Sequence, residues 1–311
     1  MTSTDIHPHR RTDDSSYALP FWKLSALGND FAVVDLRSGG GRLSADTLAS
    51  LGDRHHGVGC DLILTLQPPL PGADARFAIW TPDGRSSDQC GNGLRCVAHL
   101  LTTIDPAPMR RHLMYIDSPS RRHEVIAETA NIYRTAMGPP SFADIRLTTP
   151  PTSADADRDS RPGEPRALMV DLFECGALRC TPVSVGNPHL VTFVESVADW
   201  DRFPLQTVAR AVQSGGIFPE DTNVTVAYAA EPTHIIQRTY EFGAGETNSC
   251  ASAACATTAI HIASLRQSKT VALTIEQPGG QLAAMWSGLL TDDIHITGPA
   301  TLVYEGRLIT R

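Results

Sequence analysis

The sequence predicts an α/β fold built from two similar halves, and two repeated features carry this prediction. One is a cysteine at the start of an apolar, helix-compatible run, which occurs at Cys90–Cys96 and again at Cys250–Cys255. The other is a glycine-asparagine landmark, Gly28-Asn29 in one half and Gly186-Asn187 in the other. The spacing from asparagine to cysteine is nearly the same in both halves. We therefore expect a duplicated domain with one cysteine in each copy.

The first half contains both strand patterns and helical patterns. Residues 1–19 are polar and are expected to form a disordered extension. The domain itself is expected over 20–137 and again over 299–311. Strands are predicted at 21–24, 31–35, 62–66, 76–80 and within 111–136, and helices at 44–56 and directly after Cys90.

The second half is expected over 138–298, beginning at a Gly-Pro-Pro sequence that is typical of a domain boundary. The segment 148–165 is rich in Pro, Asp, Ser and Arg and is predicted to be a mobile surface loop. Strands are predicted at 168–173, 189–194, 224–229 and 234–240, and helices at 205–213 and 251–265, before short strands to the end.

Composition points to a globular protein that binds a small molecule. The chain has 311 residues, 41% of them hydrophobic and 19% charged, which is enough to bury about two cores. The net charge of −8 disfavours nucleic acid and anionic membranes as partners, because both would repel the chain.

Seven cysteines are present, an odd number, and no signal peptide or long apolar span precedes them. These features predict reduced thiols in the cytoplasm. The spacings C-x5-C and C-x4-C do not suit a structural zinc site, so no metal is expected. Five of the cysteines are expected to be small buried hydrophobes: Cys60, Cys96, Cys175, Cys180 and Cys255.

The other two, Cys90 and Cys250, stand at predicted helix starts. Unsatisfied backbone N–H groups and the helix dipole favour a thiolate there, and the same groups bind carboxylates. Two such starts facing each other could hold one carboxylate with its α carbon between the sulfurs, so that one thiolate removes a proton while the opposite thiol donates one. This inversion needs no cofactor. Two buried core cysteines, or a thiol redox pair that cycles through a disulfide, are the alternatives from the residues alone.

Four motifs together resemble the diaminopimelate epimerase family, in order and spacing, from about Phe21 to Arg311. They are Leu27-Gly-Asn-Asp-Phe31, Asp83-Gly-x5-Cys90-Gly-Asn-Gly-x-Arg-Cys96, Val185-Gly-Asn-Pro-His189 and Gly243-Ala-Gly-Glu-Thr-x-x-Cys250. The resemblance implies two pseudo-symmetric domains, each a curved, mostly antiparallel sheet wrapped around a central helix. It also implies a cofactor-independent two-base epimerase, an amino-acid substrate and a homodimer.

The resemblance also assigns roles to individual residues. It makes Cys90 and Cys250 the catalytic base and acid, and Glu241 the group that holds the substrate ammonium. It places His189 close to the reacting centre. The carboxylate-binding helix starts would be formed by Gly91, Asn92, Ala251 and Ser252, and the substrate-binding asparagines would be Asn29, Asn187 and Asn223.

Four positions depart from the family pattern. Leu62, Thr81 and Phe242 stand where the family has glutamine, asparagine and arginine, and Ala251 stands where it has glycine. In the family, the polar groups at the first three positions hold the far amino-acid end of diaminopimelate, and the loss of an arginine partner typically costs about 2–5 kcal/mol. The activity that we expect from the resemblance is that of a diaminopimelate epimerase. A racemase of another amino acid, such as histidine, and a non-catalytic amino-acid-binding protein are the alternatives.

Overall fold

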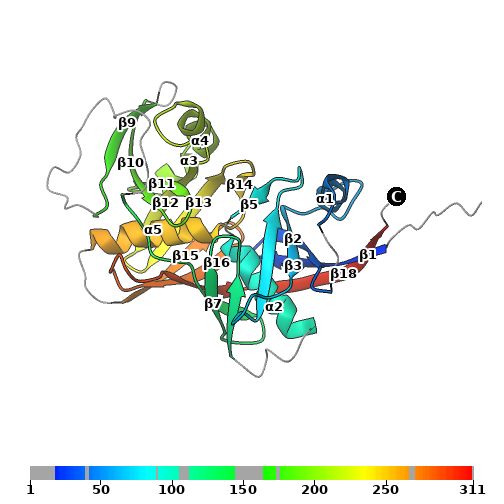
Figure 1. Ribbon diagram of the computed structural model, residues 1–311. Coiled ribbons are helices and arrows are strands. Elements are labelled where there is room, and N and C mark those ends of the chain that lie inside the picture. Colours follow the sequence, from blue (N-terminus) through cyan, green and yellow to red (C-terminus); the bar gives the residue numbers. More distant parts are fainter. Residues whose placement is uncertain are drawn as a thin grey trace, which may run out of the picture.

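The protein has two lobes, in each of which a curved part of one continuous 18-stranded sheet surrounds a long central helix (Figure 1). The computed structural model describes residues 18–38, 42–88, 90–104, 112–143, 164–172, 176–265 and 270–309. The predicted α/β class and the two pseudo-symmetric domains are confirmed. The first strand begins at Ala18, so the end of the expected 1–19 extension belongs to the sheet. Most of that extension, Cys175 and nearly all of the expected 148–165 loop lie outside the described residues.

The elements follow the predicted order. The first half contains β1 (Ala18–Ala26), β2 (Asn29–Asp35), α1 (Ala45–Gly52), β3 (Leu62–Gln67), β4 (Ala75–Trp80), β5 (Ser86–Ser87), α2 (Gly91–Ile104), β6 (Leu113–Asp117), β7 (Arg122–Ala127) and β8 (Ile132–Ala136). The second half contains β9 (Leu168–Leu172), β10 (Gly176–Ser184), β11 (Pro188–Val194), α3 (Val197–Arg202), α4 (Leu205–Ser214), β12 (Asn223–Glu231), β13 (His234–Glu241), β14 (Gly245–Thr247), α5 (Ala251–Ser264), β15 (Val271–Gln277), β16 (Gly280–Trp286) and β17 (His295–Pro299), and β18 (Thr301–Ile309) follows.

Strand pairing shows the duplication directly. In the first half β2 pairs with β3 in parallel, β3 with β4 antiparallel, β4 with β6 in parallel, and β6, β7 and β8 continue antiparallel. In the second half β11, β12, β13, β15, β16 and β17 repeat this sequence of pairings in the same order and sense. Corresponding positions in the two halves can therefore be matched by register.

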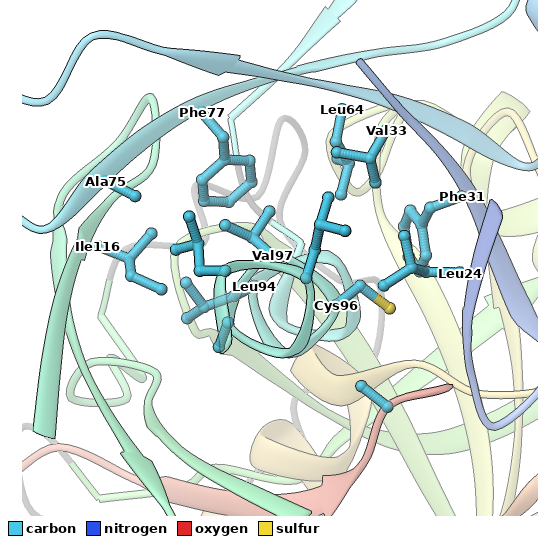
Figure 2. Close-up of a cluster of buried hydrophobic side chains, with 14 of the residues drawn as sticks. Leu24, Phe31, Val33, Leu64, Ala75, Phe77, Leu94, Cys96, Val97 and Ile116 are labelled. Atoms are coloured by element: carbon cyan, nitrogen blue, oxygen red, sulfur yellow. The ribbon is translucent and has the colours of Figure 1, made fainter. Parts of the chain in front are cut away.

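Each central helix is buried by the sheet that surrounds it. Around α2, apolar side chains from several strands point inward, among them Phe31, Leu64, Phe77 and Ile116 (Figure 2). The helix α5 is buried on every side over most of its length and is rich in alanine, which lets the second sheet approach closely. Both helix starts are thereby fixed by tertiary packing rather than by helix propensity.

Pairing between strands joins the two halves. β8 pairs antiparallel with β17, and β18 returns to pair with β1 on the first half. Outer helices complete the lobes: α1 covers β2 and β3, while α3 and α4 cover the sheet around β12. None of the helices in the described ranges is long and apolar enough to cross a membrane.

The sequence patterns do not predict β10 and α3. β10 contains Pro182, a residue that argues against a strand inside a sheet, yet it pairs with Leu190 of β11. α3 has six residues and none of them is buried, so no apolar periodicity marks it. Its start is instead stabilised by Ser196, whose hydroxyl accepts the N–H of Asp199 at 3.1 Å. The helix predicted over 44–56 is also shorter than expected and ends at Gly52.

Candidate active site

Cys90 and Cys250 lie at the starts of the two central helices, as the sequence predicted. Cys90 directly precedes α2, and its sulfur accepts the N–H of Gly93 at 3.2 Å. Cys250 is the N-cap of α5, and its sulfur accepts the N–H of Ala253 at 3.4 Å. Each sulfur thus uses one of the unsatisfied N–H groups of its own helix. The two thiols occupy equivalent positions in the duplicated fold.

The two helix starts touch. A Cβ added to Gly91 would come within 2.8 Å of the Ala251 Cβ and 2.5 Å of the Met137 Cε, so only glycine fits here. The Asn92 side chain crosses between the halves and donates to the carbonyl oxygen of Ser249 at 2.9 Å. The N-termini of α2 and α5 therefore form a single positively polarised region.

The environment of the thiols is low in polarity and contains a carboxyl group. Burial, aided by the charge of Glu241, raises the pKa of Cys90 to about 12, and the same two causes raise the pKa of Cys250 well above its usual range. The expectation that the helix starts would favour thiolates is therefore wrong for this structure, because burial outweighs the N–H groups. Burial also raises the pKa of Glu241, although Thr247 donates to its Oε1 at 2.5 Å. A cation bound beside Glu241 would lower the pKa of Glu241 again, because a cation favours the ionised carboxylate.

Polar side chains of the second half gather around Cys250. The hydroxyl of Ser252 lies 3.3 Å from the Cys250 sulfur and 3.0 Å from His189 Nε2. Asn187 Oδ1 lies 3.1 Å from the same nitrogen of His189. Burial lowers the pKa of His189 to about 3, so its ring is neutral at pH 7. Asn223 accepts the N–H of Phe242 at 3.0 Å and thereby fixes the chain after Glu241.

In the first half, Asn29 is held beside Asn92. Its Nδ2 donates to Asp61 at 2.8 Å, and its Oδ1 accepts from Asn92 at 3.2 Å. The tight turn before it contains Leu27 and Gly28, both with positive φ. This turn contacts the second half, because a Cβ on Gly28 would lie 3.0 Å from the side chain of Asn248. Asn29 is thus positioned by contacts from both domains.

The register of equivalent strand pairs shows that the two halves carry different side chains at matching positions. β2 pairs Phe31 with Leu62, and the equivalent β11 pairs His189 with Asn223. The second half thus carries a histidine and an asparagine where the first half carries two apolar side chains. The residue nine positions before the helix-start cysteine is likewise Glu241 in one half and Thr81 in the other.

Thr81 and Phe242 are placed differently from the other predicted residues. The hydroxyl of Thr81 is engaged within its own turn, donating to Asp83 and accepting the Arg85 N–H at 3.1 Å. The Phe242 side chain is 40% exposed. Arg85 reaches toward this side of the site, since its Nη2 would lie 4.0 Å from a Cβ on Gly243.

Four residues that contact the site were not among the predicted site residues. Asp61 orients Asn29, Thr247 donates to Glu241, and Gln277 Oε1 accepts the N–H of Cys250 at 2.8 Å. Arg95 donates to Asn92 Oδ1 at 2.6 Å. Arg95 and Thr247 lie inside the motifs quoted above, and Asp61 directly precedes Leu62, so the sequence could have marked all three. Gln277 is brought in by the β15–β16 hairpin. No group of three His, Cys, Asp or Glu side chains among the described residues could hold a metal ion.

The relatives of this chain are named racemases and epimerases, which are isomerases. A family model described as diaminopimelate epimerase matches residues 21–142 and 181–303. The chain belongs to the diaminopimelate epimerase family.

Individual relatives carry both kinds of name. An O-ureido-serine racemase of Streptomyces lavendulae is 39% identical over 292 residues, covering 94% of this chain and 96% of the relative. A diaminopimelate epimerase of Xanthomonas axonopodis pv. citri is 37% identical over 295 residues, covering 94% and 98%. Among solved structures, a hydroxyproline epimerase from Agrobacterium vitis matches with a TM-score of 0.66 at 14% identity, over 94% of this chain and 93% of that one. At that identity the structural match supports the fold alone.

Gly91→Ala should separate the two helix starts, because the new Cβ overlaps Met137 and Ala251. We expect a loss of about 1–3 kcal/mol in the free energy of unfolding, measured by chemical denaturation, together with reduced isomerase activity. Adding Ala251→Gly removes one of the two overlaps and should restore part of the lost stability and part of the lost activity. Ala251→Gly alone serves as the control. Unchanged stability in Gly91→Ala would contradict the close approach.

Proposed function

We propose that the protein inverts the α carbon of a free amino acid, with Cys90 and Cys250 as base and acid that exchange roles with the direction of the reaction. The observation that carries this proposal is the symmetric placement of the two sulfurs at helix starts that touch. A single carboxyl group, Glu241, influences both thiols, which supports a shared site between them. The reaction in this form uses no cofactor.

The substrate carboxylate would bind between the helix starts. Backbone N–H groups at Gly91, Asn92, Ala251 and Ser252 lie in the first turns of α2 and α5, where the helix dipoles favour negative charge. The same groups would stabilise the carboxylate as it becomes enolate-like during proton removal. The substrate ammonium would pair with Glu241, whose ionised form it favours.

The raised thiol pKa values support a role in carbon deprotonation. An amino-acid α proton is far less acidic than a thiol, and a gap on the order of ten pKa units corresponds to about 14 kcal/mol. Burial raises the pKa of Cys90 to about 12, which makes its thiolate a stronger base and narrows this gap. The cost is a smaller thiolate fraction at neutral pH, so binding of the ammonium beside Glu241 would have to favour ionisation of one sulfur.

The remaining polar residues would orient the substrate. His189 and Ser252 lie next to Cys250, and a neutral imidazole there can share a hydrogen bond without repelling the ammonium. Asn29 and Asn187 occupy equivalent positions at the two Gly-Asn turns, where each could contact the substrate from one domain. Asn223 would act at the side-chain end of the site.

We propose diaminopimelate as the first candidate substrate. Relatives at 37% identity over nearly their whole length carry the name diaminopimelate epimerase. The far carboxylate of that substrate needs a cation, and Phe242 cannot supply one. Arg85 supports the proposal because its guanidinium reaches toward Gly243, next to Phe242. If this substrate is correct, the reaction supplies a precursor for lysine.

A second candidate is an amino acid with an uncharged side chain. Two observations favour it: the apolar side chains of Leu62 and Phe242, and a relative at 39% identity that is named O-ureido-serine racemase. Arg85 is 63% exposed and already pairs with Asp83 at 2.8 Å, which weakens it as a carboxylate ligand. The recognition groups of such a substrate would come mainly from the second half.

Cys90→Ala and Cys250→Ala should each abolish inversion, because each thiol serves as base in one direction and acid in the other. We expect a loss of at least about 10³-fold in the rate, followed by polarimetry or chiral chromatography of reduced protein. Cys180→Ala is the matched control, since Cys180 is buried in a core away from the site and should leave the rate near that of the unaltered protein. An active Cys90→Ala or Cys250→Ala protein would sink the mechanism.

Arg85→Met should discriminate between the two substrates. If diaminopimelate is the substrate, KM should rise at least about tenfold through loss of the cation, with little change in folding. If the substrate is neutral, Arg85→Met should leave KM nearly unchanged, and diaminopimelate should not be turned over. Diaminopimelate and amino acids with uncharged side chains are each tested on the unaltered protein and on Arg85→Met. Arg122→Met, at a different ion pair, is the control.

We also propose a homodimer, working with free thiols in the cytoplasm. β18 pairs only with β1 among the described strands and exposes Val303, Tyr304 and Ile309, which leaves an apolar edge for a second copy. Cys60, Cys90, Cys96, Cys180, Cys250 and Cys255 are free, which supports a reducing compartment. Sedimentation should give a dimer at micromolar concentration and a smaller species for Tyr304→Glu. A monomer in both cases would contradict the proposed assembly.

A further inference from the structure

Arg95 is a fully buried cation without an acidic partner. It lies on α2, little more than one helical turn beyond Cys90, and its exposed fraction is 0%. Within the described ranges, none of the salt bridges includes Arg95. Buried arginines are usually paired with a carboxylate, because an uncompensated buried charge is costly. A position that tolerates this cost calls for a functional explanation.

Neutral groups satisfy the guanidinium. Its Nη2 donates to Asn92 Oδ1 at 2.6 Å, its Nη1 to the Gly91 carbonyl at 3.5 Å, and its Nε to the Pro299 carbonyl at 3.4 Å. Gly298 on β17 packs beside it: a Cβ there would be in ordinary contact with the Arg95 Nε at 3.4 Å, and its overlap would be with the Leu282 Cδ2 at 2.3 Å. These contacts fix the side chain and leave its positive charge uncancelled.

The bond to Asn92 sets the orientation of that amide. With Oδ1 facing the guanidinium, the Nδ2 of Asn92 must point the other way, where it donates to Asn29 Oδ1 at 3.2 Å and to the Ser249 carbonyl at 2.9 Å. Without Arg95 the amide could rotate and lose its contact with the second half. Arg95 therefore acts on the junction of the two helix starts through Asn92.

The charged and titratable groups near Arg95 are mostly thiols. Cys96 on α2, Cys90 directly before α2 and Cys255 on α5 interact with its charge, and Glu241 on β13 acts on Cys90 with the opposite sign. Burial lowers the pKa of Arg95 to about 10, which still leaves it protonated at pH 7. Its charge lowers the pKa of Cys90, against the effects of burial and Glu241.

We propose that Arg95 is a positioning residue for the inversion: its unpaired buried charge stabilises the Cys90 thiolate, and its hydrogen bond to Asn92 holds the two helix starts together. The proposal rests on the proposed role of Cys90 as a base. No substrate contact is assigned to Arg95. A carboxylate partner would defeat this role, because it would cancel the charge that Cys90 experiences.

The test is the alkylation of Cys90 by iodoacetamide between pH 7 and 10, followed by mass spectrometry of the Cys90 peptide. The thiolate is the reactive form, so below its pKa the rate at a given pH falls tenfold for each unit by which the pKa rises. Arg95→Met should slow alkylation at least about tenfold at every pH in this range. Arg95→Lys, which keeps the charge, should recover most of the rate, and Arg122→Met should match the unaltered protein.

Alkylation needs no substrate, so its outcome is independent of whether any amino acid is inverted. Circular dichroism and thermal denaturation establish that each variant is folded. If Arg95→Met is folded and alkylates at the unaltered rate, the electrostatic role is overturned. If Arg95→Met does not fold, Arg95→Lys and Arg95→Gln are compared instead, and equal rates for these two overturn the proposal.

Discussion

The close contact between the starts of α2 and α5 is the constraint on which the rest of the structure depends. Gly91 permits it by lacking a Cβ, and the bond from Asn92 to the Ser249 carbonyl spans it. Because each helix is enclosed by its own half of the sheet, the two halves must meet where the helices meet. The pairing of β8 with β17 fixes that meeting in the backbone. Each start then carries one sulfur that accepts an N–H of its own helix, next to the contact between the two halves.

The duplication and the two central helices could be predicted from the sequence. The spacing of the Gly-Asn landmarks and the cysteines predicted the duplication, and the apolar runs after Cys90 and Cys250 predicted helices that the structure contains. Helix starts and tight turns could be predicted because each requires particular residue types at particular positions. The short helix α3 leaves no such signal, since none of its residues is buried.

The parts that were not predictable depend on contacts between distant segments. Gln277 reaches the N–H of Cys250 only because the β15–β16 hairpin folds against the start of α5. The equivalence of Leu62 with Asn223 follows from strand register, which no local pattern encodes. Arg95 was visible in the sequence as part of a motif, but its burial without a carboxylate partner is a property of the packed structure.

In the proposed mechanism, the groups that transfer protons differ from the groups that recognise the substrate. The two sulfurs are equivalent in position, which suits a reaction that runs in both directions, whereas the polar side chains around them come mainly from the second half. The first half contributes Phe31 and Leu62 at the matching positions. If Cys90 and Cys250 transfer the protons as proposed, substrate preference can change through the surrounding side chains without disturbing the inversion.

The most direct test of this account is the position of deuterium after the first turnovers in heavy water. With two bases, the product should carry solvent deuterium at its α carbon, because the donating thiol has exchanged with solvent. The recovered substrate should remain unlabelled, because the opposite thiol returns the proton it removed. Equal early labelling of substrate and product would instead indicate a single base that acts on both faces, and it would contradict the paired roles of Cys90 and Cys250.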